Sequence, residues 1–269
     1  MSKIPGEHRV PDPHRLLAEL DSAVAAGVFA VHYQPVVEIA TGSMIGVEAL
    51  IRWPRDDGTF LPPDLFIPAA EDSGIIEPMT ELLMRRAAAE LGPALRQRRA
   101  LHLAINLSAR HFETDRIVAA VKACFADSEI APAQIHFEVT ERSLLANRDG
   151  QTLAVMTALR ARGHALALDD FGTGYADHHA LDRFPFDTLK IDQSFVREVG
   201  ADAVPTDALA AIAATARARH LRIIAEGIET APQAAAVTAI GVRYGQGHHF
   251  APPLPIIALA ALLDQSTPA

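Results

Sequence analysis

The spacing of the apolar, β-branched runs limits the fold more than any other feature of this 269-residue chain. Only four residues, 40–43, separate the first two runs, whereas segments of helical period separate most of the later ones. A parallel crossover needs about a dozen residues, so the short link predicts an antiparallel hairpin. The later alternation predicts a parallel sheet with crossover helices. Together they predict an α/β fold, a TIM-like (β/α)8 barrel with an antiparallel first strand. The expected strands are Val31–Ile39, Met44–Trp53, Leu101–Leu107, Ile135–Val139, Ala165–Leu168, Thr188–Ile191, Leu221–Ala225 and Gly241–Tyr244.

A barrel of this type commonly uses about 250 residues as one domain. We therefore expect a flexible extension over residues 1–15, a single barrel domain over 16–264 and a tail over 265–269. The Pro- and Gly-containing stretch Pro54–Gly74 is expected to be a long loop with a short helix at Leu65–Glu71. The expected crossover helices are Glu81–Arg96, Asp115–Phe125, Gln151–Ala161, Asp207–Arg219 and Ala231–Ile240.

Charge and hydropathy limit the kinds of molecule that the protein is expected to bind. The chain has 24 Lys and Arg residues and 33 Asp and Glu residues, which gives a net charge of −9. This charge argues against polymeric nucleic acid as a partner but allows a small phosphorylated ligand. The longest apolar stretch, Ala251–Leu263, contains prolines and is too short to span a membrane. No apolar signal segment is visible near the N-terminus, so we expect a cytoplasmic protein without a membrane partner. The single cysteine, Cys124, excludes an internal disulfide.

Polar residues stand at the end of each expected strand. In a parallel barrel these ends converge on one mouth, where catalytic groups gather. Each carboxylate alone is equally well explained as a helix N-cap or a solvated turn residue. Together they would repel each other unless a cation compensates them, and oxygen ligands suit Mg²⁺ or Mn²⁺, so the pattern favours a site for one or two ions. The residues are Glu48, Asn106, Glu138, Asp169, Asp170, Lys190, Glu226 and Gln246.

Asp169 and Asp170 are consecutive carboxylates, which can bridge one metal and reach a second. Two neighbouring metals assist phosphodiester displacement by holding the attacking and leaving oxygens. Lys190 would then donate to the attacking water or to the charge that develops on phosphorus. The alternative for Lys190 is a lysine that snorkels at the edge of the barrel.

Several motifs resemble the EAL family of bacterial cyclic di-GMP phosphodiesterases, named for Glu48-Ala49-Leu50. The resemblance covers about residues 33–255 in the family's order and spacing, and it implies a barrel with a reversed first strand. The motifs are YQPVVEI, GVEALIRW, FIPAAEDSG, INLSAR, FEVTER, DDFGTGY, LKIDQSFV, AEGIE and GQG.

The resemblance also implies roles for individual residues. It makes Glu48, Asn106, Glu138 and Asp169 ligands of one metal, and Asp169, Asp170 and Glu226 ligands of a second. Lys190, with Glu226, belongs to the catalytic set, and Gln246 matches a position for metal-bound solvent and substrate. Gln34, Leu50 and Arg52 match positions that line the substrate, where a guanidinium can hold a phosphate in a bidentate manner. Glu141 matches a glutamate that steadies the loop after Asp170.

This chain departs from the family in the loop after DFGTGY, where Ala176, Asp177, His178 and His179 replace the usual two serines and a leucine. In the family that loop supports the second metal and contributes to a homodimer contact. We expect a homodimer through the loop after Asp170, with this departure bearing on both properties.

The residues and the resemblance lead to one hypothesis. The protein is a phosphodiesterase that uses Mg²⁺ or Mn²⁺, as two ions, to hydrolyse cyclic di-GMP to linear pGpG. The first alternative is a catalytically silent EAL-like receptor that binds cyclic di-GMP and acts through a protein partner, although such proteins typically lack metal ligands that are present here. A second is an unrelated Mg²⁺-dependent barrel enzyme, such as an enolase-type lyase, which would need a base for carbon acid chemistry.

Overall fold

The first two strands form the hairpin that the short link predicts. A computed structural model describes residues 12–145, 150–172, 178–200 and 202–265. Strands β1 (Ala30–Glu38) and β2 (Met44–Pro54) are antiparallel, with Gln34 opposite Glu48. Strand β1 also pairs antiparallel with β9 (Tyr244–Gln246), so it enters the barrel as a reversed strand.

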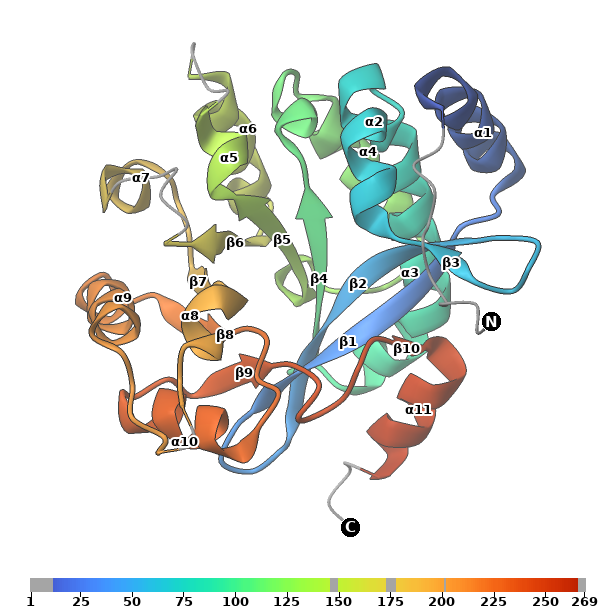
Figure 1. The fold of residues 1–269 in the computed structure, drawn as a ribbon. Helices are drawn as coiled ribbons and strands as arrows, with labels where there is room; N and C mark the ends of the chain where they lie inside the picture. The colour runs from blue at the N-terminus through green and yellow to red at the C-terminus, as the bar shows by residue number, and fades with distance from the viewer. Residues whose placement is uncertain (1–11, 146–149, 173–177, 201, 266–269) are drawn as a thin grey trace.

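The remaining barrel strands are parallel, and the sheet closes through the pairing of β1 with β2 (Figure 1). The expected TIM-like barrel with an antiparallel first strand is therefore confirmed. Two short strands, β3 (Phe60–Leu61) and β10 (Leu254–Pro255), add to β2 and β1. The parallel strands between β2 and β9 are β4 (His102–Leu107), β5 (Ile135–Thr140), β6 (Ala165–Phe171), β7 (Thr188–Ile191) and β8 (Arg222–Ala225).

The last strand begins later than the sequence suggested. Gly241 has a left-handed φ of 84°, and its N–H donates to the carbonyl of Thr238. This turn ends the preceding helix, so the expected strand Gly241–Tyr244 is wrong by its first three residues. The backbone becomes extended only at Tyr244.

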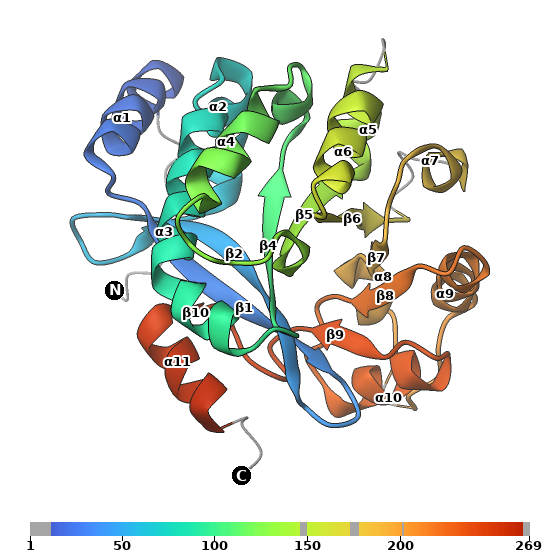
Figure 2. The ribbon, with the colours of Figure 1, turned by 180° about the vertical axis from the view of Figure 1, so that it is seen from behind.

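Helices surround the barrel, as Figures 1 and 2 show from opposite sides. The expected crossover helices are all present, and the helix before β4 is longer than expected. Helix α1 begins at Pro13, and helix α11 lies beside β10 in both views. The helices are α1 (Pro13–Ala26), α2 (Ile67–Ser73), α3 (Ile76–Gln97), α4 (Arg116–Phe125), α5 (Glu141–Leu145), α6 (Gln151–Ala161), α7 (His178–Arg183), α8 (Gln193–Arg197), α9 (Asp207–Ala218), α10 (Ala231–Ala239) and α11 (Ile256–Gln265); short 3₁₀ turns are η1 (Pro63–Leu65), η2 (Ala109–Phe112) and η3 (Pro132–Gln134).

Two apolar clusters hold the elements together. The larger one joins the barrel strands to the inner faces of the helices. The smaller one lies under α1 and α2, where the ring of Trp53 is 5.4 Å from that of Phe29 and 5.4 Å from that of Phe66. Within the described ranges, the structure holds no helix long and apolar enough to cross a membrane.

Histidines occupy the N-terminal end of the barrel. The rings of His102 on β4 and His136 on β5 are stacked, with centroids 4.0 Å apart and planes 7° from parallel. Gly46 on β2 lies against His102, and a Cβ at this position would be 2.2 Å from Nε2 of the imidazole. Only glycine leaves room for the buried ring at this point.

Candidate active site

An ammonium lies at the centre of the opposite end of the barrel. Nζ of Lys190, at the third position of β7, is 2.7 Å from Oε1 of Glu226 and 2.8 Å from Oε2 of Glu138. It is also 3.3 Å from Oδ1 of Asp169 and 3.5 Å from Oε2 of Glu48. Lys190 is fully buried, so it is not a lysine that snorkels at the barrel edge.

Amide side chains hold Glu48 on the other side of this cluster. Nδ2 of Asn106 donates to one carboxylate oxygen of Glu48 at 2.7 Å, and Nε2 of Gln246 donates to the other at 2.6 Å. Gln246 also donates to Oε1 of Gln34 at 2.9 Å. The reversed strand β1 thus contributes to the mouth, because it lies between β2 and β9 and carries Gln34 opposite Glu48.

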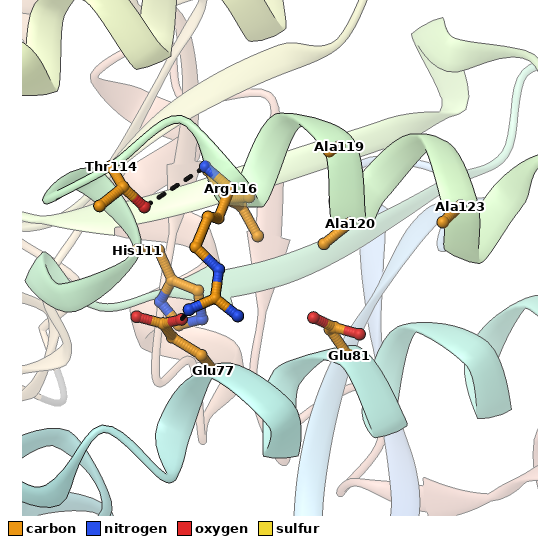
Figure 3. Close-up of a pocket in the computed structure, with 9 residues that line it drawn as sticks. Glu77, Glu81, His111, Thr114, Arg116, Ala119, Ala120 and Ala123 are labelled. Atoms are coloured by element: carbon orange, nitrogen blue, oxygen red, sulfur yellow. Dashed lines mark hydrogen bonds and ion pairs between the residues drawn. The ribbon is translucent and has the colours of Figure 1, made fainter.

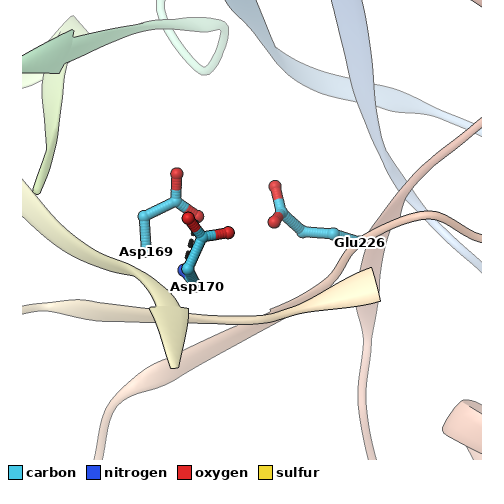
Figure 4. Close-up of side chains that lie close together, drawn as sticks. All are labelled: Asp169, Asp170 and Glu226. Atoms are coloured by element: carbon cyan, nitrogen blue, oxygen red, sulfur yellow. Dashed lines mark hydrogen bonds between the residues drawn. The ribbon is translucent and has the colours of Figure 1, made fainter. Parts of the chain in front are cut away.

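A second group of carboxylates lies beside the first (Figure 4). Asp169 and Asp170 come from the end of β6, and Glu226 follows β8. One oxygen from each carboxylate lies within 4.8 Å of the other two. Asp170 has a left-handed φ of 55°, where the pairing of β6 with β7 loses its regular register. This backbone conformation turns consecutive carboxylates toward the same region instead of opposite faces of the sheet.

Glu141 supports the end of β6 from behind. Its side chain is buried, and Oε1 accepts a hydrogen bond of 3.0 Å from the N–H of Gly172. Gly172 has φ of 104°, and a Cβ there would lie 2.6 Å from the ring of Phe195. The chain after Asp170 can follow this path only with glycine.

Burial and charge move the pKa values of the central groups. Burial raises the pKa of Glu138 and of Glu226 well above the ordinary value, despite the neighbouring ammonium. Burial opposes the charged form of Lys190, but the surrounding carboxylates raise its pKa well above the ordinary value. The ammonium therefore stays charged and balances one of these carboxylates.

The two outer carboxylates behave differently. Burial alone would raise the pKa of Glu48, but the Lys190 charge and the amide hydrogen bonds hold it below the ordinary value. Burial and the charge of Asp169 raise the pKa of Asp170 to about 6. Asp170 is thus a carboxylate whose ionised form is destabilised until a cation approaches.

The donor set fits divalent cations. If all five carboxylates ionise to bind metal, the single ammonium leaves an excess of four negative charges, which two divalent ions would balance. Among the described residues, Gln246 Oε1 is a buried side-chain oxygen with no hydrogen-bond partner, and it is a further oxygen available to a cation or its water. Oxygen ligands of this kind suit Mg²⁺ or Mn²⁺.

Two cavities open on either side of this cluster. One, of about 400 Å³, is lined by Arg52, Asn106 and Asp169 among others. The other, of about 280 Å³, is lined by Gln34, Glu226 and Gln246 among others. Leu50 and Asp170 line both, so an elongated ligand could extend across the acidic cluster. Arg52 donates from Nη1 to the carbonyl of Ile51 at 2.9 Å and is partly buried in the first cavity.

The structure brings all the site residues expected from the sequence to this mouth, with Glu141 behind it. The structure does not test the expected dimer contact, which involves the loop after Asp170. Ala176 and Asp177 lie outside the described residues, and His178 and His179 begin α7. The expected dimer therefore stays a prediction.

Sequence reasoning missed several residues that line the mouth, and Asp192 is the one that bears on the carboxylates. Asp192 lines the second cavity, and its charge contributes to the raised pKa of Asp170. It directly follows strand β7, and its side chain caps helix α8 by accepting from the N–H of Ser194. The strand-end rule that identified its neighbours would have found it as well.

A closed barrel with one reversed strand defines the class, a TIM-like barrel protein whose mouth carries a group of carboxylates that could hold a cation. Residues 17–253 match the EAL domain, so the chain belongs to the EAL domain family. The reversed first strand and the motif around Glu48 are therefore properties of a known family.

The similarity extends to individual proteins and structures. The chain is 38% identical to the probable cyclic di-GMP phosphodiesterase PdeB of Escherichia coli over 248 residues, covering 92% of this chain and 46% of PdeB. The structure of the PaMucR phosphodiesterase in complex with c-di-GMP matches with a TM-score of 0.82 and 34% identity, covering 91% of this chain and 99% of that one. The EAL enzyme Bd1971 in its cAMP-bound form matches with a TM-score of 0.87 and 28% identity, covering 94% of this chain and 70% of that one. The chain spans less than half the length of PdeB.

Proposed function

We propose that this chain is a metal-dependent phosphodiesterase that hydrolyses cyclic di-GMP to linear pGpG. The observation that carries the proposal is the acidic cluster, with Asp169, Asp170 and Glu226 converging beside Lys190, between two cavities. The cavities suit a ligand with two nucleotide halves and a phosphodiester near the carboxylates. The identity of the nucleotide rests on the likeness to PdeB and to the PaMucR complex.

The carboxylates would hold two divalent cations. Glu48, Asn106, Glu138 and Asp169 would bind one, and Asp169, Asp170 and Glu226 the other. Bound cations would polarise the phosphodiester and lower the pKa of the attacking water. Arg52 would hold a nonbridging phosphate oxygen, because its guanidinium offers several N–H groups to an anion.

Lys190 has the position of a group that acts on the attacking water. Its ammonium is buried, remains protonated and lies next to Glu138 and Glu226. We infer that it orients the water and stabilises the negative charge that develops on the phosphoryl oxygens. Glu141 would act at a distance, by fixing the backbone after Asp170 through Gly172.

The test is incubation of the purified protein with cyclic di-GMP and Mg²⁺ or Mn²⁺, with and without EDTA, followed by chromatographic separation of the nucleotides. We expect pGpG to form only with the metal. Asp169→Asn keeps the side-chain shape but removes a shared carboxylate, and it should abolish turnover. Cyclic di-GMP that binds but stays intact at saturating metal would contradict the proposal and favour a silent receptor.

A further inference from the structure

Another cavity lies outside the barrel, between α3 and the start of α4 (Figure 3). Its volume is about 300 Å³. Glu77 and Glu81, one turn apart on α3, form one side. Ala119, Ala120 and Ala123 on α4 form the other, where their small side chains leave space between the two helices.

A buried imidazole lines the inner end of this cavity. His111 is 4% exposed, and its Nδ1 accepts a hydrogen bond of 3.1 Å from the N–H of Ser108. Burial lowers the pKa of His111 to about 4, so the ring is neutral and its proton resides on Nε2. In the part of the chain that the structure describes, Nε2 has no hydrogen-bond partner. A buried N–H without a partner is unfavourable, so a ligand acceptor placed at Nε2 would be stabilising.

The charged groups at this end can change partners. The guanidinium of Arg116 is 3.5 Å from Oε2 of Glu77, and its side chain is 76% exposed. An exposed pair of this kind contributes little to stability, so Arg116 can turn toward a ligand at low cost. Figure 3 shows the pair across the same end of the cavity as His111.

We propose that this cavity binds a small apolar α-amino acid. The ligand carboxylate accepts from the Nε2–H of His111 and from Arg116, while the ammonium lies against Glu77 and Glu81. The apolar side chain packs on the alanine face of α4. The cavity offers both N–H donors, from His111 and Arg116, and the carboxylates of Glu77 and Glu81, which matches a zwitterion better than a simple acid or amine.

A metal ion does not fit the same groups. Nδ1 of His111 is occupied as an acceptor, so Nε2 carries the proton and offers no lone pair. Among the described residues, the carboxylates of Glu77 and Glu81 do not converge with His111 into a metal-binding group.

The site is connected to the mouth through Ser108. This residue follows β4, lines the mouth cavity that also contains Asn106, and donates to His111. Binding at the outer cavity does not depend on the proposed phosphodiesterase activity, so the two hypotheses fail separately.

The test is calorimetric titration of the intact protein with L-leucine, compared with 4-methylpentanoate, which lacks the amine, and isoamylamine, which lacks the carboxylate. We expect saturable one-to-one binding of leucine, with both analogues at least about tenfold weaker. Ala123→Leu fills the cavity and should weaken binding at least about tenfold, whereas Ala154→Leu, at an exposed position of α6, should not. Absence of saturable leucine binding, equal binding of either analogue, or unchanged binding in Ala123→Leu would overturn the proposal.

A second measurement needs no substitution. In ¹⁵N spectra of the histidine rings, leucine should shift the Nε2–H resonance of His111 and leave that of the distant His102 unchanged. An unchanged His111 resonance at saturating leucine would also overturn the assignment of the carboxylate to this nitrogen.

Discussion

The ammonium of Lys190 lies 2.7 Å from Oε1 of Glu226 at the mouth of the barrel, where Lys190 is fully buried and Glu226 is partly buried. The pair is not isolated, because Glu138, Asp169 and Glu48 surround the same nitrogen within 3.5 Å. One cation holds four carboxylates in place. Lys190 is thus required for the charge balance of the metal-free protein as well as for the proposed chemistry.

Lys190→Met should lower kcat by about 10²-fold or more, with a much smaller effect on substrate affinity, because the charge acts mainly in the transition state. It should also destabilise the metal-free protein by about 3–5 kcal/mol at pH 8, since the buried carboxylates lose their cation. The loss should be smaller at pH 5 than at pH 8, because the raised pKa values of Glu138 and Glu226 favour their neutral forms at the lower pH. Steady-state kinetics and urea unfolding in EDTA measure both effects.

Lys122→Met is the matched control, because Lys122 is exposed on α4. It should change neither kcat nor stability. A Lys190→Met protein with kcat within a few-fold of wild type would remove Lys190 from the mechanism, and unchanged stability at both pH values would contradict its role in the charge balance.

The sequence was sufficient for the barrel and for the composition of the mouth, for physical reasons. A link of four residues is too short for a parallel crossover, so the length of this link alone predicted the reversed first strand. Polar residues at strand ends predicted a shared pocket because parallel strands converge there. The position of the Lys190 side chain was harder to predict. In a strand of only four residues, the sequence pattern does not decide whether a lysine points into the barrel or toward its outer edge.

Features that depend on packing between distant elements could not be read from the sequence. The cavity beside His111 exists because alanines on α4 face glutamates on α3, and neither helix alone indicates the space. The stacking of His102 on His136 depends on the register of β4 and β5 and on the glycine at position 46. The start of β9 depended on how α10 ends.

Divalent metal should stabilise the protein more at pH 8 than at pH 5. A carboxyl group with a raised folded-state pKa adds stability below its unfolded pKa, and this stability is lost as pH rises through the folded value. Asp170, with a pKa of about 6, therefore becomes an unfavourable charge above that pH, which a cation relieves. The rise in melting temperature on replacing EDTA with Mn²⁺, measured at each pH, gives the metal effect alone. In Asp170→Asn the rise should be smaller at pH 8, and an equal rise at both pH values in wild type would contradict the prediction.

Glu141→Ala should weaken Mn²⁺ binding by about tenfold or more, because it removes the acceptor that holds the backbone after Asp170. Glu141→Gln keeps an amide oxygen at the same place and should lose less. Calorimetric titration of Mn²⁺ into each variant measures the difference. Equal affinities for Glu141→Ala and wild type would show that Glu141 does not position the metal ligands.

The histidine stack should make the protein sensitive to acid. Burial and the charge of Arg222 lower the pKa of His136 to about 4. Between pH 6.5 and 4 the unfolded chain binds a proton at this residue that the folded protein does not, so stability falls as pH decreases. The full loss from this residue is about 3 kcal/mol.

His136→Phe tests this prediction because phenylalanine keeps a ring against His102 but cannot be protonated. The variant loses the 3.2 Å contact of Nε2 with the carbonyl of Ala133, which lowers stability to a similar extent at both pH values while the wild-type ring is neutral. The informative quantity is therefore the change in unfolding free energy between pH 7.5 and pH 4.5, measured in EDTA. Wild type should lose about 2–3 kcal/mol more than the variant over this interval. Parallel pH profiles for the two proteins would mean that His136 does not titrate abnormally, and would place the origin of any acid sensitivity elsewhere.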